Sequence, residues 1–108
     1  MTKLHWGYDF TCGKSVDAIL AAFNAAGPCR WRLGDSDIYG FYLKCQPKDG
    51  AEIRVYERRQ FRLWRPGDRG GFYAEFESDA KDVAVRPQIA RNFLDLLHVI
   101  KAKNIVET

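Results

Sequence analysis

The chain has 108 residues, a length typical of one domain with one hydrophobic core. Its hydrophobic fraction is 46%, and 7 Phe, 5 Tyr and 3 Trp supply enough apolar surface to offset the entropy of ordering the chain, so we do not expect disorder. The net charge of +3 is modest, because 17 Lys and Arg oppose 14 Asp and Glu, and it does not by itself indicate nucleic-acid binding.

The sequence favours a soluble, cytoplasmic protein with no membrane association. No stretch approaches the roughly 18 apolar residues that a transmembrane helix requires, and residues 1–10 lack a basic segment followed by an apolar run. The three cysteines, Cys12, Cys29 and Cys45, are odd in number and widely spaced. That pattern is more typical of buried thiols in a reducing compartment than of a disulfide framework.

The first quarter of the chain predicts a strand followed by a helix. Residues 4–10 alternate between apolar and polar side chains, which is the period of a half-buried strand. Ser15 is suited to cap a helix, and apolar side chains then recur at three- and four-residue spacing. Gly27 and Pro28 end this amphipathic helix.

The middle of the chain predicts an antiparallel meander. Segments with turn-forming residues interrupt it at residues 34–37, 47–50 and 66–71. Between them we expect short strands over residues 29–33, 38–46, 52–57, 61–65 and 72–77. The connections are too short for parallel crossovers, so antiparallel pairing follows.

A second helix closes the predicted fold. Pro87 suits the first helical turn, an apolar stripe continues to Ile100, and Asn104 is expected to end the helix. The predicted order is β-α-β-β-β-β-β-α, and two amphipathic helices can cover one face of such a sheet. We therefore expect a two-layer α+β sandwich with a mostly antiparallel sheet, in which residues 1–108 form a single domain.

Motifs for catalysis or metal binding are weak. Gly13-Lys14-Ser15 lies between a strand and a helix, but a phosphate-binding loop needs a second glycine where this chain has Tyr8. We interpret Gly13 as a turn residue and Ser15 as a helix cap. Since no two cysteine or histidine side chains have the spacing of zinc ligands, we expect no metal and no cofactor.

One predicted surface stands out because the basic excess lies in residues 29–73, which contain ten basic and six acidic side chains. If Ile53 and Val55 point into the core, strand alternation places Arg54 and Tyr56 on the opposite face. The same alternation assigns to this outward surface Arg30, Arg32, Arg54, Tyr56, Arg62 and Trp64. The basic, glycine-rich loop over residues 65–71 adds Arg65 and Arg69 to the candidate binding residues.

The arginine- and aromatic-rich surface has two interpretations. Guanidinium groups and aromatic planes bind phosphates, carboxylates or unstacked bases. Alternatively, cross-strand pairs of Arg54 or Arg62 with Glu75 or Glu77 neutralise the surface, which then contributes only to sheet stability.

Three functional hypotheses follow from the sequence. The first is a non-enzymatic binding or accessory domain that contacts an anionic partner, protein or nucleic acid, through the arginine- and aromatic-rich surface. The second is a small enzyme or small-molecule-binding domain with a pocket between sheet and helices, using His98, Asp9 or Cys12. The third is a homodimer that buries the same surface, with Trp64 and Tyr56 at the interface and no external ligand.

Overall fold

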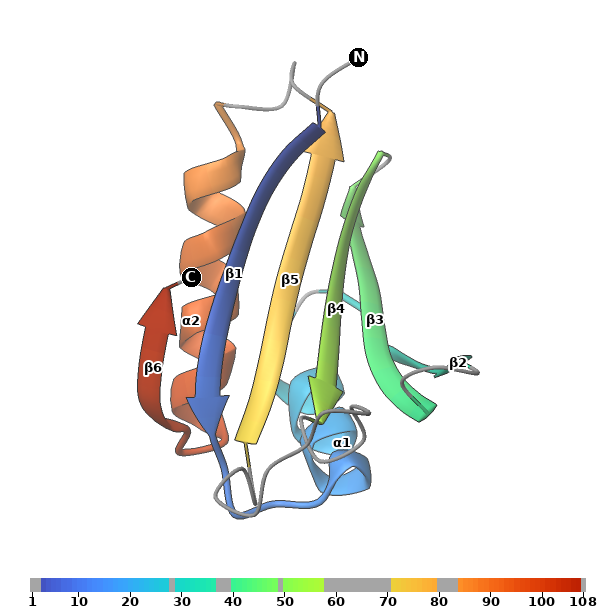
Figure 1. Ribbon diagram of the computed structural model, residues 1–108, viewed down its shortest axis with the longest axis vertical. Helices are drawn as coiled ribbons and strands as arrows, with labels where there is room; N and C mark the ends of the chain where they lie inside the picture. Colours follow the sequence, from blue (N-terminus) through green and yellow to red (C-terminus); the bar gives the residue numbers. More distant parts are fainter. Residues whose placement is uncertain are drawn as a thin grey trace.

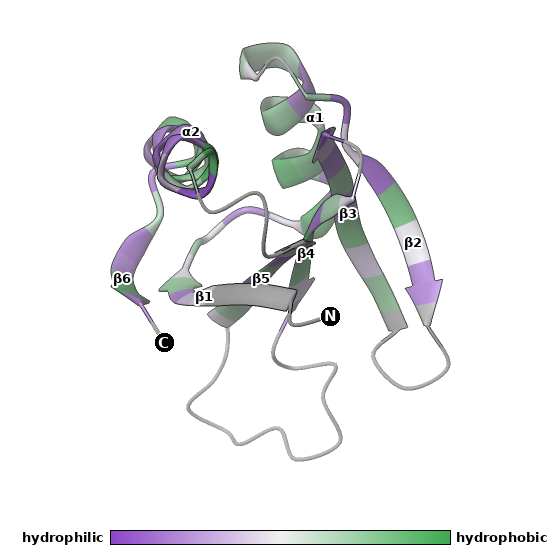
Figure 2. Cartoon of the chain, turned by 90° about the horizontal axis from the view of Figure 1, so that it is seen from above, coloured by the Kyte–Doolittle hydropathy of each residue, from purple (hydrophilic) through white to green (hydrophobic). Residues whose placement is uncertain are grey.

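The computed structural model describes residues 3–27, 29–36, 40–48, 50–57, 71–79 and 84–107. Their elements are β1 (Lys3–Thr11), α1 (Val16–Ala26), β2 (Arg32–Ser36), β3 (Gly40–Lys48), β4 (Ala51–Glu57), β5 (Gly71–Asp79), α2 (Arg86–Val99) and β6 (Lys103–Glu107). The strands form one antiparallel sheet in the order β2-β3-β4-β5-β1-β6 (Figure 1). Both helices lie on the same face of this sheet (Figure 2), so the predicted two-layer α+β class is confirmed. The strand expected over residues 61–65 lies outside the described residues.

Helix α1 forms as the sequence predicts. The Ser15 hydroxyl oxygen accepts a hydrogen bond from the backbone N–H of Ala18 at 3.2 Å, which satisfies one of the free donors of the first turn. At the other end, the Gly27 N–H donates to the Phe23 carbonyl oxygen at 2.9 Å. Ile19 and Phe23 are fully buried, so the apolar stripe of the helix faces the sheet.

Helix α2 ends earlier than the sequence indicates, at Val99 rather than near Asn104. Lys101 adopts a left-handed conformation (φ 58°), and the N–H groups of Lys101 and Ala102 bond back to carbonyl oxygens of the last turn at 3.0 and 2.9 Å. This is the Schellman arrangement, in which glycine usually takes the left-handed position. Because a lysine takes that position here, the sequence carries no signal for the early end.

The residues released by this early end form β6, a strand that the sequence analysis did not predict. Between the pairs Asp9–Val106 and Thr11–Lys103, β6 contains one residue more than β1, which makes a bulge. Asn104 lies in the bulge with a left-handed backbone (φ 55°). Its Nδ2 donates to Thr11 Oγ1 at 3.1 Å, and Thr11 Oγ1 donates to the Lys103 carbonyl oxygen at 3.2 Å. These side-chain bonds fix the bulge against β1.

Three aromatic rings join the two helices to the segment that precedes β2. Phe23 of α1, Phe93 of α2 and Trp31 pack with ring centroids between 4.9 and 6.2 Å apart, and all three are buried. Asn24 fixes the main chain of Trp31 from both sides. Its Oδ1 accepts the Trp31 N–H at 2.7 Å, and its Nδ2 donates to the Trp31 carbonyl oxygen at 3.2 Å.

Strand β2 extends through a segment that the sequence analysis assigned to a turn. A turn was expected at residues 34–37, but β2 pairs with β3 as far as Ser36. Gly34 lies opposite Tyr42, and a Cβ added at Gly34 would lie only 2.6 Å from Tyr42 Cζ. The glycine therefore makes room for an aromatic ring on the neighbouring strand, and the prediction of a turn at residues 34–36 was wrong.

Cys29 and Cys45 form a disulfide, so the prediction that both are buried thiols was wrong. Their Cα atoms are 6.6 Å apart, although 16 positions separate them in the sequence. The antiparallel pairing of β2 with β3 brings them together, which their spacing does not reveal. Structural disulfides persist mainly in oxidising compartments, so these cysteines no longer support a cytoplasmic location. Within the described part of the chain, no helix is long and apolar enough to cross a bilayer.

Removal of the disulfide should lower the stability of the fold. The Cys29→Ala/Cys45→Ala double variant should lose roughly 2–4 kcal/mol of the free energy of unfolding, because the closed loop restricts the unfolded chain. Urea unfolding followed by circular dichroism measures the loss. Reductant should destabilise the parent protein and leave the double variant unchanged. Equal stability of the two proteins under oxidising conditions would contradict a stabilising disulfide.

Candidate functional site

The face of the sheet opposite the helices, called the outer face below, carries part of the predicted binding surface. In β4, Ile53 and Val55 are buried in the core beneath the helices. Arg54 and Tyr56 alternate with them and lie on the outer face, and neither belongs to the core cluster. The predicted phase of alternation is thus confirmed for β4.

Three positively charged residues, called the cationic row below, lie side by side on three neighbouring strands. Arg32 of β2 pairs with Lys44 of β3, and Lys44 pairs with Arg54 of β4. Directly opposite residues of an antiparallel pair share a face, with Cβ atoms about 5 Å apart. The three charges therefore form one patch that runs to the edge strand β2, and Glu75 of β5 lies opposite Arg54 at its other end.

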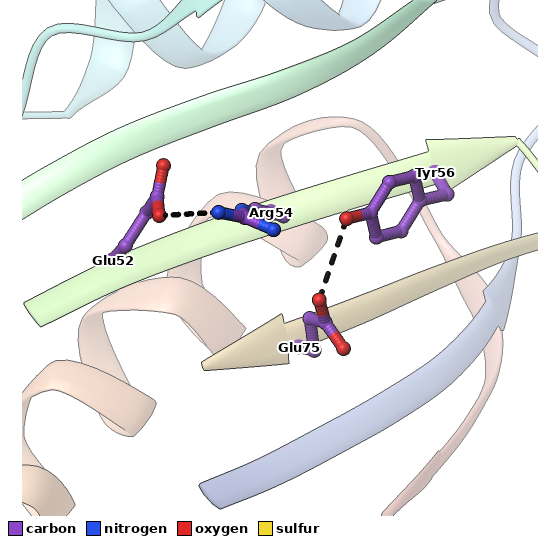
Figure 3. A network of polar contacts seen from close by, with 4 residues as sticks. All are labelled: Glu52, Arg54, Tyr56 and Glu75. Atoms are coloured by element: carbon purple, nitrogen blue, oxygen red, sulfur yellow. Dashed lines mark hydrogen bonds and ion pairs between the residues drawn. The ribbon is translucent and has the colours of Figure 1, made fainter. Parts of the chain in front are cut away.

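Arg54, at the end of the cationic row near β5, belongs to a network of polar contacts (Figure 3). Arg54 forms an ion pair with Glu52 on its own strand, with 2.9 Å between Nη2 and Oε2. The pKa of the Arg54 guanidinium is raised above its ordinary value, mainly because of this hydrogen bond. Glu75, which the sequence analysis offered as a partner for Arg54, instead accepts a long hydrogen bond of 3.4 Å from the Tyr56 hydroxyl.

Tyr56 has the predicted direction but not the predicted exposure. Its exposed fraction is 5%, and its ring lies 5.2 Å from the Tyr42 ring, centroid to centroid. The Arg54 guanidinium lies 6.0 Å from the Tyr42 centroid, within reach of a cation–π contact. Burial is the main cause that raises the pKa of Tyr56 to about 12. The expectation that Tyr56 projects into solvent was therefore wrong.

Arg32 and Arg54 lie on the outer face as expected, but the other predicted binding residues do not join them in the described structure. Arg30 was wrongly assigned to the outer face. Strand β2 begins only at Arg32, so the alternation does not extend back to Arg30, which is exposed and lines a cavity on the helix side. The remaining candidates lie outside the described residues: Arg62, Trp64, Arg65 and Arg69.

The residues suggested for an enzymatic site are not gathered in one. Cys12 is buried, and its thiol donates a hydrogen bond to the Ile100 carbonyl oxygen, with 3.5 Å between Sγ and the oxygen. His98 is exposed on α2, and Asp9 lies on β1 opposite Tyr73. Among the described residues, no group of three or more His, Cys, Asp or Glu side chains could hold a metal ion. This arrangement does not support the enzyme hypothesis that used these three residues.

A cavity of about 340 Å³ lies between α2 and the ends of β3 and β4. The sequence predicted a pocket between the sheet and the helices but not which residues line it. The disulfide Cys29–Cys45 and Trp31 form part of its wall. We expected both cysteines to be buried, and nothing in the spacing of these residues shows that the core is incompletely filled beside them.

Neither the protein-family models nor the curated proteins contain a match to this chain.

The contribution of Tyr56 to stability should fall at alkaline pH. Its folded pKa of about 12 exceeds the ordinary value of 10.0, so between these values the unfolded chain loses a proton that the folded chain keeps. The free energy of unfolding of the parent should fall relative to that of a Tyr56→Phe variant by up to about 1.4 kcal/mol per pH unit. Urea unfolding of both proteins from about pH 9 to pH 12 measures the difference. Parallel pH profiles would contradict a buried, protonated Tyr56.

Proposed function

We propose that this chain is a non-enzymatic binding domain that takes up an extended, acidic segment of a partner protein along the edge strand β2. The observation that carries the proposal is the position of the cationic row, which runs across the outer face to an edge of the sheet. Extended peptides commonly bind by adding a strand at such an edge.

The charge arrangement favours a negatively charged partner. Like charges directly opposite each other on neighbouring strands destabilise a sheet. Arg54 is compensated by Glu52, but within the described residues neither Arg32 nor Lys44 forms an ion pair. Carboxylates of a bound partner segment next to Arg32 would place negative charges at the end of the cationic row and reduce this repulsion.

The backbone of β2 supports strand addition. β2 is the first strand of the sheet order, so among the described strands it has a neighbour only on its β3 side. Its helix-facing side also presents apolar surface, since 43% of Leu33 and 54% of Phe41 on the adjoining strand are exposed. A partner strand that alternates acidic and apolar side chains would match both faces of this edge.

The described aromatic side chains favour a protein partner over a nucleic acid. Proteins that bind single-stranded nucleic acids stack bases on exposed aromatic planes. Here Tyr56 is buried, while Tyr42 is half-buried, packed against Tyr56 and over Gly34. An acidic peptide needs no such plane, because backbone hydrogen bonds and carboxylate contacts provide its recognition.

The disulfide also indicates the compartment in which the domain would meet such a partner. Because Cys29–Cys45 is of the kind that persists under oxidising conditions, we place the binding domain in an oxidising compartment rather than in the cytoplasm.

Strand addition at β2 predicts a defined NMR response. A capped nine-residue peptide of alternating Glu and Val, added to ¹⁵N-labelled protein, should shift and slow the hydrogen exchange of β2 amides that do not bond to β3. The Arg32→Glu/Lys44→Glu variant should weaken binding at least about tenfold, since charge-assisted contacts are lost. An alternating Lys and Val peptide should not bind.

The matched control is Arg91→Glu, which changes the charge of an exposed residue on α2 and should leave peptide binding unchanged. Shifts on the outer face without added protection of β2 amides would contradict strand addition. Salt-sensitive binding of an oligothymidine that requires Arg32 and Lys44 would instead assign the cationic row to nucleic acid. Concentration-dependent sedimentation with protection of β2 in the absence of peptide would show that a second copy occupies the edge.

A further inference from the structure

The cavity beside the disulfide has a composition suited to a small ligand. Its inner wall is mostly apolar and comes from both layers: Trp31, Ile53, Ile89, Phe93, Leu96 and the Cys29–Cys45 disulfide. Polar side chains that are themselves exposed complete the lining: Arg30, Gln46 and Asn92. Its volume of about 340 Å³ lies in the range of known small-molecule sites, which are also mostly apolar with a few polar groups.

Trp31, which lines this cavity, has a buried hydrogen-bond donor without a partner among the described residues. Asn24 satisfies both main-chain groups of Trp31, but the indole Nε1–H is buried and has no hydrogen-bond partner among the residues that the structure describes. A buried donor without an acceptor is unfavourable and uncommon in folded proteins. The nitrogen exposes less than 1 Å², so it does not open into the cavity, and an acceptor reaches it only if the wall moves.

The other polar groups of the cavity favour a negatively charged acceptor. Arg30 is an exposed residue of the lining, and within the described residues its guanidinium forms no ion pair. The Asn92 Oδ1 already accepts a hydrogen bond from Gln88 Nε2 at 2.9 Å, so its Nδ2 remains as a donor. Among the described residues of the lining, Arg30 is the only charged one, so the charge of this part of the lining is positive.

We propose that this cavity binds a small apolar carboxylate. The apolar body lies between α2 and β4, and the carboxylate accepts from the Trp31 indole N–H and is neutralised by Arg30. This site lies on the helix side of the sheet, whereas the cationic row lies on the outer face. The two proposals can therefore be tested independently, and failure of one does not contradict the other.

A titration of ¹⁵N-labelled protein with 2-naphthoate tests the proposal. The chain has three tryptophans, so the Trp31 indole resonance is the one that disappears in Trp31→Phe. We expect 2-naphthoate to move this resonance downfield and to shift the amides of Ile89 and Asn92. Binding of the neutral analogue 2-naphthalenemethanol should be at least about tenfold weaker, because the charge-assisted contact is lost.

Two variants separate the role of Arg30 from a general effect of charge. Arg30→Gln should weaken 2-naphthoate binding at least about tenfold. Arg91→Gln, next to Asn92 on α2 but not part of the cavity lining, should leave it unchanged. Both measurements stand even if Trp31→Phe does not fold.

Four results would overturn the proposal. The first is the absence of shifts at the cavity up to millimolar 2-naphthoate. The second is a set of shifts confined to the cationic row. The third is equal affinity for the neutral analogue, which would remove the carboxylate from the ligand class. The fourth is an unmoved Trp31 indole resonance in the saturated complex, which would show that its N–H is not the donor.

Discussion

The antiparallel register of β3, β4 and β5 is the constraint on which both candidate sites depend. Because successive side chains of a strand point to opposite faces, pairing Val55 with Leu43 and Ala74 places all three under the helices. The same register puts Arg54 beside Lys44 on the outer face. A shift by one residue would bury charged side chains without partners and expose the core, which is strongly unfavourable. Burial of apolar side chains thus determines where the charges lie.

Local signals in the sequence were sufficient for much of this arrangement. Ser15 and Gly27 mark the ends of α1, and the two-residue period of residues 52–57 gives the correct faces for Arg54 and Ile53. These features depend on neighbours a few positions apart, so the sequence contains the information. The α+β class follows from the same patterns, since short connections between strands require antiparallel pairing.

The features that sequence reasoning missed depend on contacts between distant residues or on unusual backbone conformations. The Cys29–Cys45 bond needs the register of β2 against β3, and the burial of Tyr56 needs its outer-face neighbours. The left-handed Lys101 ends α2 where glycine would be expected, which frees the residues of β6. The burial of the Trp31 indole N–H without a partner among the described residues is likewise not visible in the sequence, because it results from how α1 and α2 pack around one ring.

The sheet therefore separates two surfaces of different chemistry, a cationic row on its outer face and a mostly apolar cavity, lined in part by Arg30, on its helix side. Both disappear if the register of β4 is wrong, so interstrand nuclear Overhauser effects around Arg54 are the most direct test. The register of β4 predicts contacts from Arg54 to Lys44 on β3 and to Glu75 on β5. Contacts from Arg54 to Leu43 and Ala74 in their place would show a register shifted by one residue and would contradict it.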